Sequence, residues 1–296
     1  MEGNPQPPPP PWVALETNLT ENILKRLDLV DILGNVQRVC TTWHRVCRDP
    51  AMWRAIVIRN DGYLRHLLDI DKLCRVAVNR SDGQLRDITL EHFGDDKLLL
   101  FICERSTHLK RLHLTFCSDI TSSGLATALK NTPEVEELHL NMMTHVYADD
   151  IDAIGNSCPM LKSFTFTRGS RDCPFESLPS ELALAIAGSM PNLRHLGLFG
   201  STMDNLDLKE ILDKCPRLKW LDLRNCLKVD LGGDLGQRLS QQMTNLRRPT
   251  DSVCVWRYSS PFDDPPLRSN NPFDPPPSDL SSIGENCTFS PDTLTK

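Results

Sequence analysis

A short phrase of hydrophobic and variable positions recurs along the middle of the chain. It consists of a hydrophobe, two variable residues, a second hydrophobe, one variable residue and a third hydrophobe. The six occurrences are Leu85/Ile88/Leu90, Leu109/Leu112/Leu114, Val135/Leu138/Leu140, Leu161/Phe164/Phe166, Leu193/Leu196/Leu198 and Leu218/Leu221/Leu223. Alternation within the phrase predicts a short strand with one buried face, and an interval of 24 to 32 residues leaves room for a helix after each strand.

Helical patterns fill the intervals between these strands. They cover residues 96–104, 122–129, 149–155, 180–188, 206–213 and 235–243, and several end before a proline that stops the helix. The period is that of leucine-rich repeats, so residues 85–245 predict an α/β solenoid of about six repeats, with parallel strands on its concave side and helices on its convex side. The longest interval contains residues 168–179, which we interpret as an inserted loop.

The segment before the repeats changes to helical spacing. Residues 12–53 predict three short amphipathic helices, the first opened by a capping box of Asn18 and Glu21. Residues 54–84 then predict one or two helices that connect this module to the solenoid and cap its first repeat, since an uncapped repeat would expose its apolar side.

The two ends of the chain are rich in proline. Residues 1–11 predict an extended leader, and residues 246–296 a disordered tail. The tail contains Asn271-Pro272-Phe273, which resembles the short peptides bound by EH domains, but so short a match arises readily by chance and we interpret it as part of a solvated linker.

Composition excludes several classes of protein. The 296 residues carry a formal net charge of −6, which argues against a nucleic-acid partner, and no apolar run is long enough to span a membrane. The 11 cysteines form no C-x-x-C pair, so we expect reduced thiols and a location in the nucleus, the cytoplasm or both.

The N-terminal helical module resembles an F-box. The matching positions, in order, are Leu15, Leu19, Ile23-Leu24, Leu27, Asp31-Ile32, Val39-Cys40, Trp43 and Met52-Trp53. Glu16, Asn18 and Asp28 depart from the family pattern, and the absence of a proline at position 16 is the departure with most bearing on adaptor binding. A plain helical cap of the array is the alternative. Together with the repeats, residues 12–245 resemble the short plant F-box/leucine-rich-repeat proteins of the Skp-interacting type.

That resemblance implies a function. The F-box (12–53) would bind a Skp-family adaptor and through it a cullin and a RING protein, while the repeats would hold an unknown protein target for ubiquitination by this SCF-type ligase. Binding of short helices in a partner's groove relies on apolar anchors. The expected anchors are Leu15, Leu19, Ile23, Leu24 and Ile32, whereas Val39, Trp43 and Trp53 are expected in the internal core.

Side chains on the outward face of the predicted strands form columns across the repeats. Aromatic residues beside arginine are typical of protein interfaces, so these columns predict the surface that binds the target. The candidate residues are Arg111, His113, His139, His195, Phe199, Trp220 and Arg224. For Trp220, packing on the C-terminal cap is an equally good interpretation.

No motif in the chain predicts catalysis or a cofactor. Phosphate-binding loops, nucleophile elbows and zinc-protease motifs are absent from the sequence, as are the Cys/His spacings of a RING protein. His113 and His139 share a column, but we interpret both as surface residues and predict no metal site. The sequence therefore predicts a non-catalytic subunit. The alternatives are a repeat scaffold whose proline-rich tail acts in trafficking or signalling, and a repeat protein that inhibits an enzyme.

Overall fold

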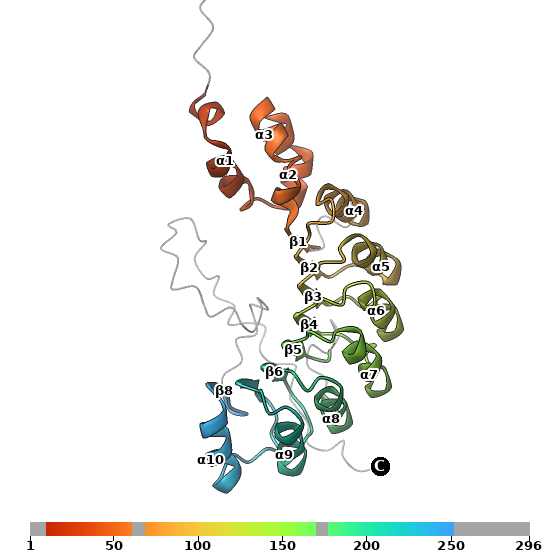
Figure 1. Cartoon of the computed structure of the whole chain (residues 1–296), viewed down its shortest axis with the longest axis vertical. Coiled ribbons are helices and arrows are strands. Elements are labelled where there is room, and N and C mark those ends of the chain that lie inside the picture. The colour runs from red at the N-terminus through yellow and green to blue at the C-terminus, as the bar shows by residue number, and fades with distance from the viewer. Residues whose placement is uncertain (1–9, 61–68, 170–176, 252–296) are drawn as a thin grey trace, which may run out of the picture. The chain divides into compact units, whose positions relative to one another are not determined.

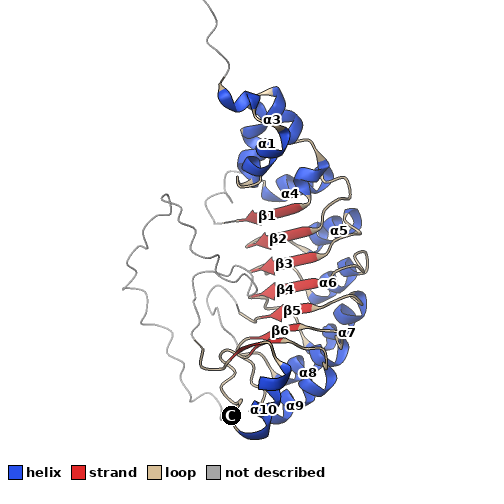
Figure 2. Ribbon diagram, turned by 60° about the vertical axis from the view of Figure 1, so that its left-hand side comes forward, coloured by secondary structure: helices blue, strands red, loops and turns tan. Residues whose placement is uncertain are grey.

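Eight parallel strands, hydrogen-bonded in the order in which they occur along the chain, form one sheet (Figure 2). The computed structural model describes residues 10–60, 69–169 and 177–251, and all statements below concern these residues. The strands are β1 (Ala55–Arg59), β2 (Asp87–Glu91), β3 (Arg111–Thr115), β4 (Glu137–Asn141), β5 (Ser163–Phe166), β6 (His195–Leu198), β7 (Trp220–Asp222) and β8 (Asn245–Arg247).

The recurring phrase sets the register of the sheet. The second hydrophobe of one phrase pairs with the second hydrophobe of the next, as in Ile88 with Leu112 and Leu112 with Leu138. The residue just before each of the strands β1 to β7 has a carbonyl that accepts two N–H groups from the start of the next strand. The Lys110 carbonyl, for example, accepts those of Glu136 and Glu137 at 2.9 and 3.1 Å. No register slip occurs between β1 and β8, because a slip of one residue would move every hydrophobe to the opposite face.

Seven helices alternate with the strands along the chain and form a second layer beside the sheet (Figure 1). They are α4 (Ile70–Arg80), α5 (Asp96–Arg105), α6 (Ser122–Leu129), α7 (Ala148–Ser157), α8 (Ser180–Ser189), α9 (Asn205–Lys214) and α10 (Gly233–Gln242). Short polar side chains start several of them: Asp95 and Thr121 accept the N–H groups of Leu98 and Gly124, and Asp204 forms a capping box with Asp207.

The core lies between the strand layer and the helix layer. The hydrophobes of the six phrases are at most 2% exposed, and Phe164 and Phe166 are the largest fully buried side chains. Helices α7 and α8 also pack closely: a Cβ atom added at Gly155 would lie only 2.9 Å from the Ser189 carbonyl oxygen. Such packing leaves little room for changes in side-chain volume.

The N-terminal module consists of short helices. Its elements are η1 (Pro11–Ala14), α1 (Thr17–Leu24), α2 (Leu29–Gly34), η2 (Val36–Arg38), α3 (Thr41–Val46) and η3 (Pro50–Trp53). Arg80, the last residue of α4, joins this module to the solenoid: its guanidinium donates to the Gln37 side chain at 2.8 Å and to the Cys47 carbonyl at 3.2 Å, and it lies over the Trp53 ring. The indole of Trp53 also donates to the Cys47 carbonyl at 2.9 Å.

The sheet has one strand more at each end than the sequence analysis predicts. β1 lies in the segment for which only helices are expected, and β8 follows the last predicted phrase. Both have a signal in the sequence: Trp53, Ile56 and Ile58 repeat the phrase with tryptophan first, and Met243 with Leu246 begins it again. The expected capping box is wrong, because Glu16 is the N-cap of α1 and Asn18 lies inside the helix.

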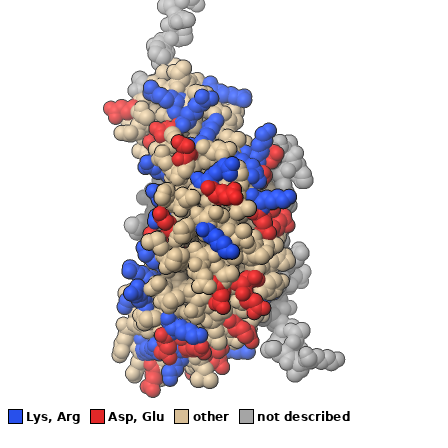
Figure 3. All heavy atoms as spheres, turned by 45° about the vertical axis from the view of Figure 1, so that its right-hand side comes forward, with Lys and Arg blue, Asp and Glu red and all other residues tan. Residues whose placement is uncertain are grey.

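Several sequence predictions fall outside the described residues. These are most of the proline-rich leader, most of the loop expected at 168–179 and nearly all of the tail with Asn271-Pro272-Phe273. Among the described residues, no helix is both long and apolar enough to cross a membrane. On the face shown in Figure 3, basic and acidic side chains are interspersed.

The first prediction concerns the core. Phe164→Ala should lower the free energy of unfolding by about 3 to 5 kcal/mol, because it removes a fully buried ring from between the two layers. The matched control is Leu206→Ala in α9, where the side chain is 77% exposed and a change within about 0.5 kcal/mol is expected. Urea unfolding followed by circular dichroism measures both; equal losses in the two variants would contradict this account of the core.

Candidate interaction surfaces

Exposed apolar side chains are concentrated in the N-terminal module. Five of the ten large hydrophobes that are exposed among the described residues lie between positions 12 and 39, so the module carries an apolar surface out of proportion to its length. They are Trp12 (46% exposed), Leu19 (52%), Ile23 (46%), Leu27 (39%) and Val39 (50%). Exposed apolar surface of this kind is typical of protein-binding sites.

Helix α1 divides its apolar residues between two faces. Leu19 and Ile23 are four residues apart, so they lie together on the outer face. Leu24 is fully buried and packs in the hydrophobic core. We therefore define Leu19 and Ile23 as the exposed pair of α1.

The structure corrects three expectations about this module. Leu24 and Ile32 were expected as anchors but are 0% and 6% exposed, because they face the other short helices. Val39 was expected in the core but is half exposed, because it follows the turn of η2 rather than lying inside a helix. Leu15 is partly buried, and Trp53 is buried as expected.

The predicted columns on the strand face exist in register. Asp87, Arg111 and Glu137 are neighbours on β2, β3 and β4, and the Arg111 guanidinium forms a two-point ion pair with Asp87. One column over, His113 is the register partner of His139, and their rings meet edge to face with centroids 4.3 Å apart.

Not all of the expected target-binding residues are accessible. Arg111 is exposed, and His113, His195 and Arg224 are partly buried. His139, Phe199 and Trp220 are 0%, 8% and 7% exposed, so the expectation that they lie on the open surface is wrong.

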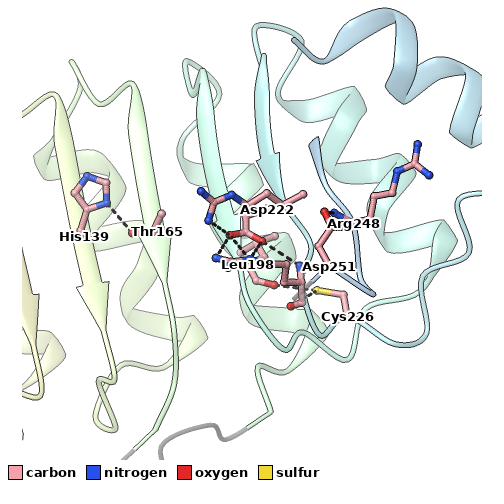
Figure 4. Close-up of polar contacts among 9 residues, drawn as sticks. His139, Thr165, Leu198, Asp222, Cys226, Arg248 and Asp251 are labelled. Carbon is pink, nitrogen blue, oxygen red and sulfur yellow. Dashed lines mark hydrogen bonds and ion pairs between the residues drawn. The ribbon is translucent and has the colours of Figure 1, made fainter. Parts of the chain in front are cut away.

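Local contacts explain the burial of His139 and Trp220. His139 lies between its register partners His113 and Thr165, and its Nδ1 is 2.6 Å from the Thr165 hydroxyl (Figure 4). Trp220 lies beside His195 on one side and the Arg247 guanidinium on the other, which favours packing at the C-terminal end of the sheet over full exposure. Phe199 is followed by Gly200 at φ +68°, where the chain turns back after β6.

A buried carboxylate organises that C-terminal end. Asp222 is 3% exposed, and the side chain of Arg224 donates to it at 2.6 to 3.0 Å, with Arg247 at 3.8 Å. Arg224 was expected to contact a target, but its Nε and one of its terminal nitrogens donate to Asp222 within the fold. Sequence analysis did not find Arg247, because β8 carries only part of the phrase.

The buried thiols of the repeats have structural positions. Cys117 and Cys226 follow β3 and β7, and the Cys226 thiol donates to the Leu198 carbonyl at 2.9 Å (Figure 4). Burial raises the pKa of both thiols to about 12. At neutral pH these groups are therefore protonated and unsuited to nucleophilic attack.

Burial favours the uncharged form of two histidines on the strand face, His113 and His195. Burial, and next the neighbouring His139, lower the pKa of His113 to about 3, while Glu137 acts in the opposite direction. Burial also lowers the pKa of His195. The contact with His139, followed by the charge of Arg111, holds the pKa of Glu137 below its ordinary value.

Comparisons with known proteins point to one family. A family model described as F-box-like matches residues 17–59. An Arabidopsis thaliana protein named F-box/LRR-repeat protein 23 is 42% identical over 81% of the chain, which spans 54% of that relative's length. The Arabidopsis thaliana F-box protein SKIP19 is 38% identical, with 86% of this chain and 82% of that protein covered. Among solved structures, the leucine-rich-repeat-containing protein LegL7 of Legionella pneumophila has a TM-score of 0.40 at 17% identity, covering 58% of this chain and 57% of the other.

The second prediction concerns pH. The folded pKa of His113 lies below its unfolded value of 6.5, so the unfolded chain binds more protons between pH 6.5 and about 3 and stability falls as pH falls through that window. Between pH 6.5 and 5, the free energy of unfolding should fall by about 1 to 2 kcal/mol because of this residue.

The measurement is urea unfolding of metal-free protein at several pH values. His113→Gln should flatten the pH dependence, whereas His44→Gln, which changes an exposed histidine, should not. If the free energy of unfolding depends on pH in the same way for wild type and His113→Gln, His113 is not held in its neutral form.

Proposed function

The chain belongs to the F-box/leucine-rich-repeat family of plants, and from this premise we propose that it is the substrate-recognition subunit of an SCF-type ubiquitin ligase. In this proposal the N-terminal module binds a Skp-family adaptor, and through it a cullin and a RING protein. The strand face of the solenoid binds the protein to be ubiquitinated. The observation that carries the proposal is the exposed pair of α1, Leu19 and Ile23, in the segment matched by the F-box-like family model.

The physical role of the exposed pair is that of an anchor. Each side chain leaves about half of its surface in water, and burial against a partner's apolar groove would remove that surface from solvent. Leu24, on the opposite face of the same helix, holds α1 to the rest of the module. A division between outward anchors and inward core residues on one short helix suits helix-in-groove recognition.

The proposed protein acts by proximity rather than by chemistry of its own. A target held on the strand face would be presented to a conjugating enzyme brought by the other subunits, which raises the effective concentration of its lysines. The contacts of Arg80 support this role, because a fixed joint between the module and the solenoid would keep the target at a defined distance. The raised pKa of the Cys117 and Cys226 thiols makes these two cysteines unsuited to carrying ubiquitin.

We place the target-binding surface on the accessible part of the columns, with Arg111 and His195 as its candidate contacts. The net charge of −6 agrees with a protein rather than a nucleic acid as target. We place the action of this ligase in the nucleus, the cytoplasm or both.

The third prediction tests adaptor binding. Leu19→Ala and Ile23→Ala should each weaken binding of a Skp-family adaptor by about 2 kcal/mol, which is roughly a thirtyfold rise in Kd. Leu206→Ala and Leu227→Ala are matched controls, since these side chains are 77% and 72% exposed but lie in α9 and between β7 and α10, far along the chain from α1. They should bind the adaptor as wild type does. Isothermal titration calorimetry with the full-length chain gives all five affinities.

Two results would contradict the proposal. A folded wild-type chain that binds no Skp-family adaptor would show that Glu16, Asn18 and Asp28 have removed adaptor binding, which favours a repeat scaffold. Equal affinities for the Leu19, Ile23 and control variants would place any adaptor site elsewhere on the chain. Circular dichroism melts of each variant separate loss of binding from loss of folding.

A further inference from the structure

Three potential metal ligands converge on the strand face. His113 on β3 and His139 on β4 are register partners, and Glu137 precedes His139 by two residues and therefore shares its face. One ligand atom from each of the three side chains lies within 4.8 Å of the other two, and Glu137 Oε2 is 3.8 Å from His139 Nε2. We call this set the His113/Glu137/His139 cluster.

A neighbouring hydroxyl orients the more deeply buried ring. His139 Nδ1 is 2.6 Å from Thr165 Oγ1, and Figure 4 shows this contact between β4 and β5. With the proton on Nδ1, that nitrogen donates to the hydroxyl, and Nε2, which lies 3.8 Å from Glu137 Oε2, is the ring nitrogen that would bind an ion. Histidines that bind metals are usually held by such a hydrogen bond from the ring nitrogen that does not contact the ion.

His113 supplies an independent indication. Its Nε2 is buried and has no hydrogen-bond partner among the described residues. Buried polar atoms are usually paired in folded proteins, so an unpaired ring nitrogen beside two other potential ligands is consistent with a site for an ion.

The donor set selects a class of ion. Two imidazole nitrogens and one carboxylate suit zinc and related divalent transition metals, whereas calcium and magnesium prefer oxygen ligands throughout. In a tetrahedral zinc site, neighbouring ligand atoms are about 3.3 Å apart, so the cluster would have to contract by about 1.5 Å at its widest point. Side-chain rotation of Glu137, which is partly exposed, can supply much of this movement.

The local charge also favours a cation. Glu137 contributes one negative charge, and its cationic neighbour Arg111 is already paired with Asp87. We propose that His113, Glu137 and His139 bind one divalent transition metal ion, with zinc favoured, and leave a fourth coordination position for water or for a donor group of a bound protein. The sequence alone predicts no such site, because a shared column does not reveal where the carboxylate points. The site does not depend on adaptor binding.

The fourth prediction is tested by titrating zinc chloride into the full-length, tag-free chain after alkylation of its accessible thiols. Wild type should bind one equivalent of zinc with a Kd of micromolar or tighter. Glu137→Gln should raise the Kd at least tenfold, and His113→Gln should abolish stoichiometric binding. His108→Gln is the matched control, since His108 forms an exposed pair with Glu134 at 3.0 Å without a second histidine, and it should bind as wild type does.

Cobalt(II) absorption identifies the ligands. Nitrogen and oxygen donors should give d–d bands without the intense charge-transfer band of a thiolate ligand; a thiolate band would assign the metal to cysteines and overturn the proposal. Thr165→Val tests the positioning role of the hydroxyl: zinc affinity should fall about 10-fold or more and return with Thr165→Ser.

Other outcomes also decide against the site. Absence of zinc uptake by folded wild type, or wild-type affinity in both Glu137→Gln and His113→Gln, would overturn the proposal. Should His113→Gln fail to fold, Glu137→Gln decides alone, because its side chain is partly exposed and glutamine has nearly the same shape. Neither result bears on the affinity for a Skp-family adaptor, so the two proposals fail separately.

Discussion

The structure depends on the parallel register that runs unbroken through eight strands. Ahead of each strand, a single carbonyl accepts two N–H groups from the next turn, as the Arg86 carbonyl does from Lys110 and Arg111 and the Arg194 carbonyl from Lys219 and Trp220. Each turn is thereby placed one strand spacing from its neighbour, with its three hydrophobes under the sheet. All other features of the solenoid, including its columns of side chains, follow from this repetition.

Register converts positions far apart in the chain into neighbours in space. Asp87 and Arg111 are 24 residues apart but form an ion pair, and His113 meets His139 and then Thr165 across two strand spacings. On the strand face, residues about 25 positions apart in the chain therefore become neighbours. This gives the chain both a candidate surface for a protein target and a cluster of potential metal ligands within it, without any dedicated loop.

The N-terminal module follows a different rule, because its short helices bury only part of their apolar surface against each other. Leu24 and Ile32 are used inside the module, and Leu19 and Ile23 remain outside. Arg80 then joins the module to the first helix of the solenoid through Gln37, Cys47 and Trp53. The result is a module that keeps apolar side chains exposed, connected to the strand face of the solenoid by a specific polar contact.

The sequence by itself determined the repeat, its period and its strand face, because a three-hydrophobe phrase spaced for one strand and one helix has few other ways to bury its leucines. It also identified the N-terminal module, since the ordered apolar positions from Leu15 to Trp53 match a family pattern. Only the tertiary structure decided which of those positions are exposed: the family pattern includes Leu19, Ile23 and Leu24 alike, and packing against the neighbouring helices buries Leu24 alone. Likewise, alternation along β4 places His139 on the strand face, but the contacts of His113 and Thr165 bury it. Periodicity fixes the direction of a side chain, and only its neighbours on other elements fix what covers it.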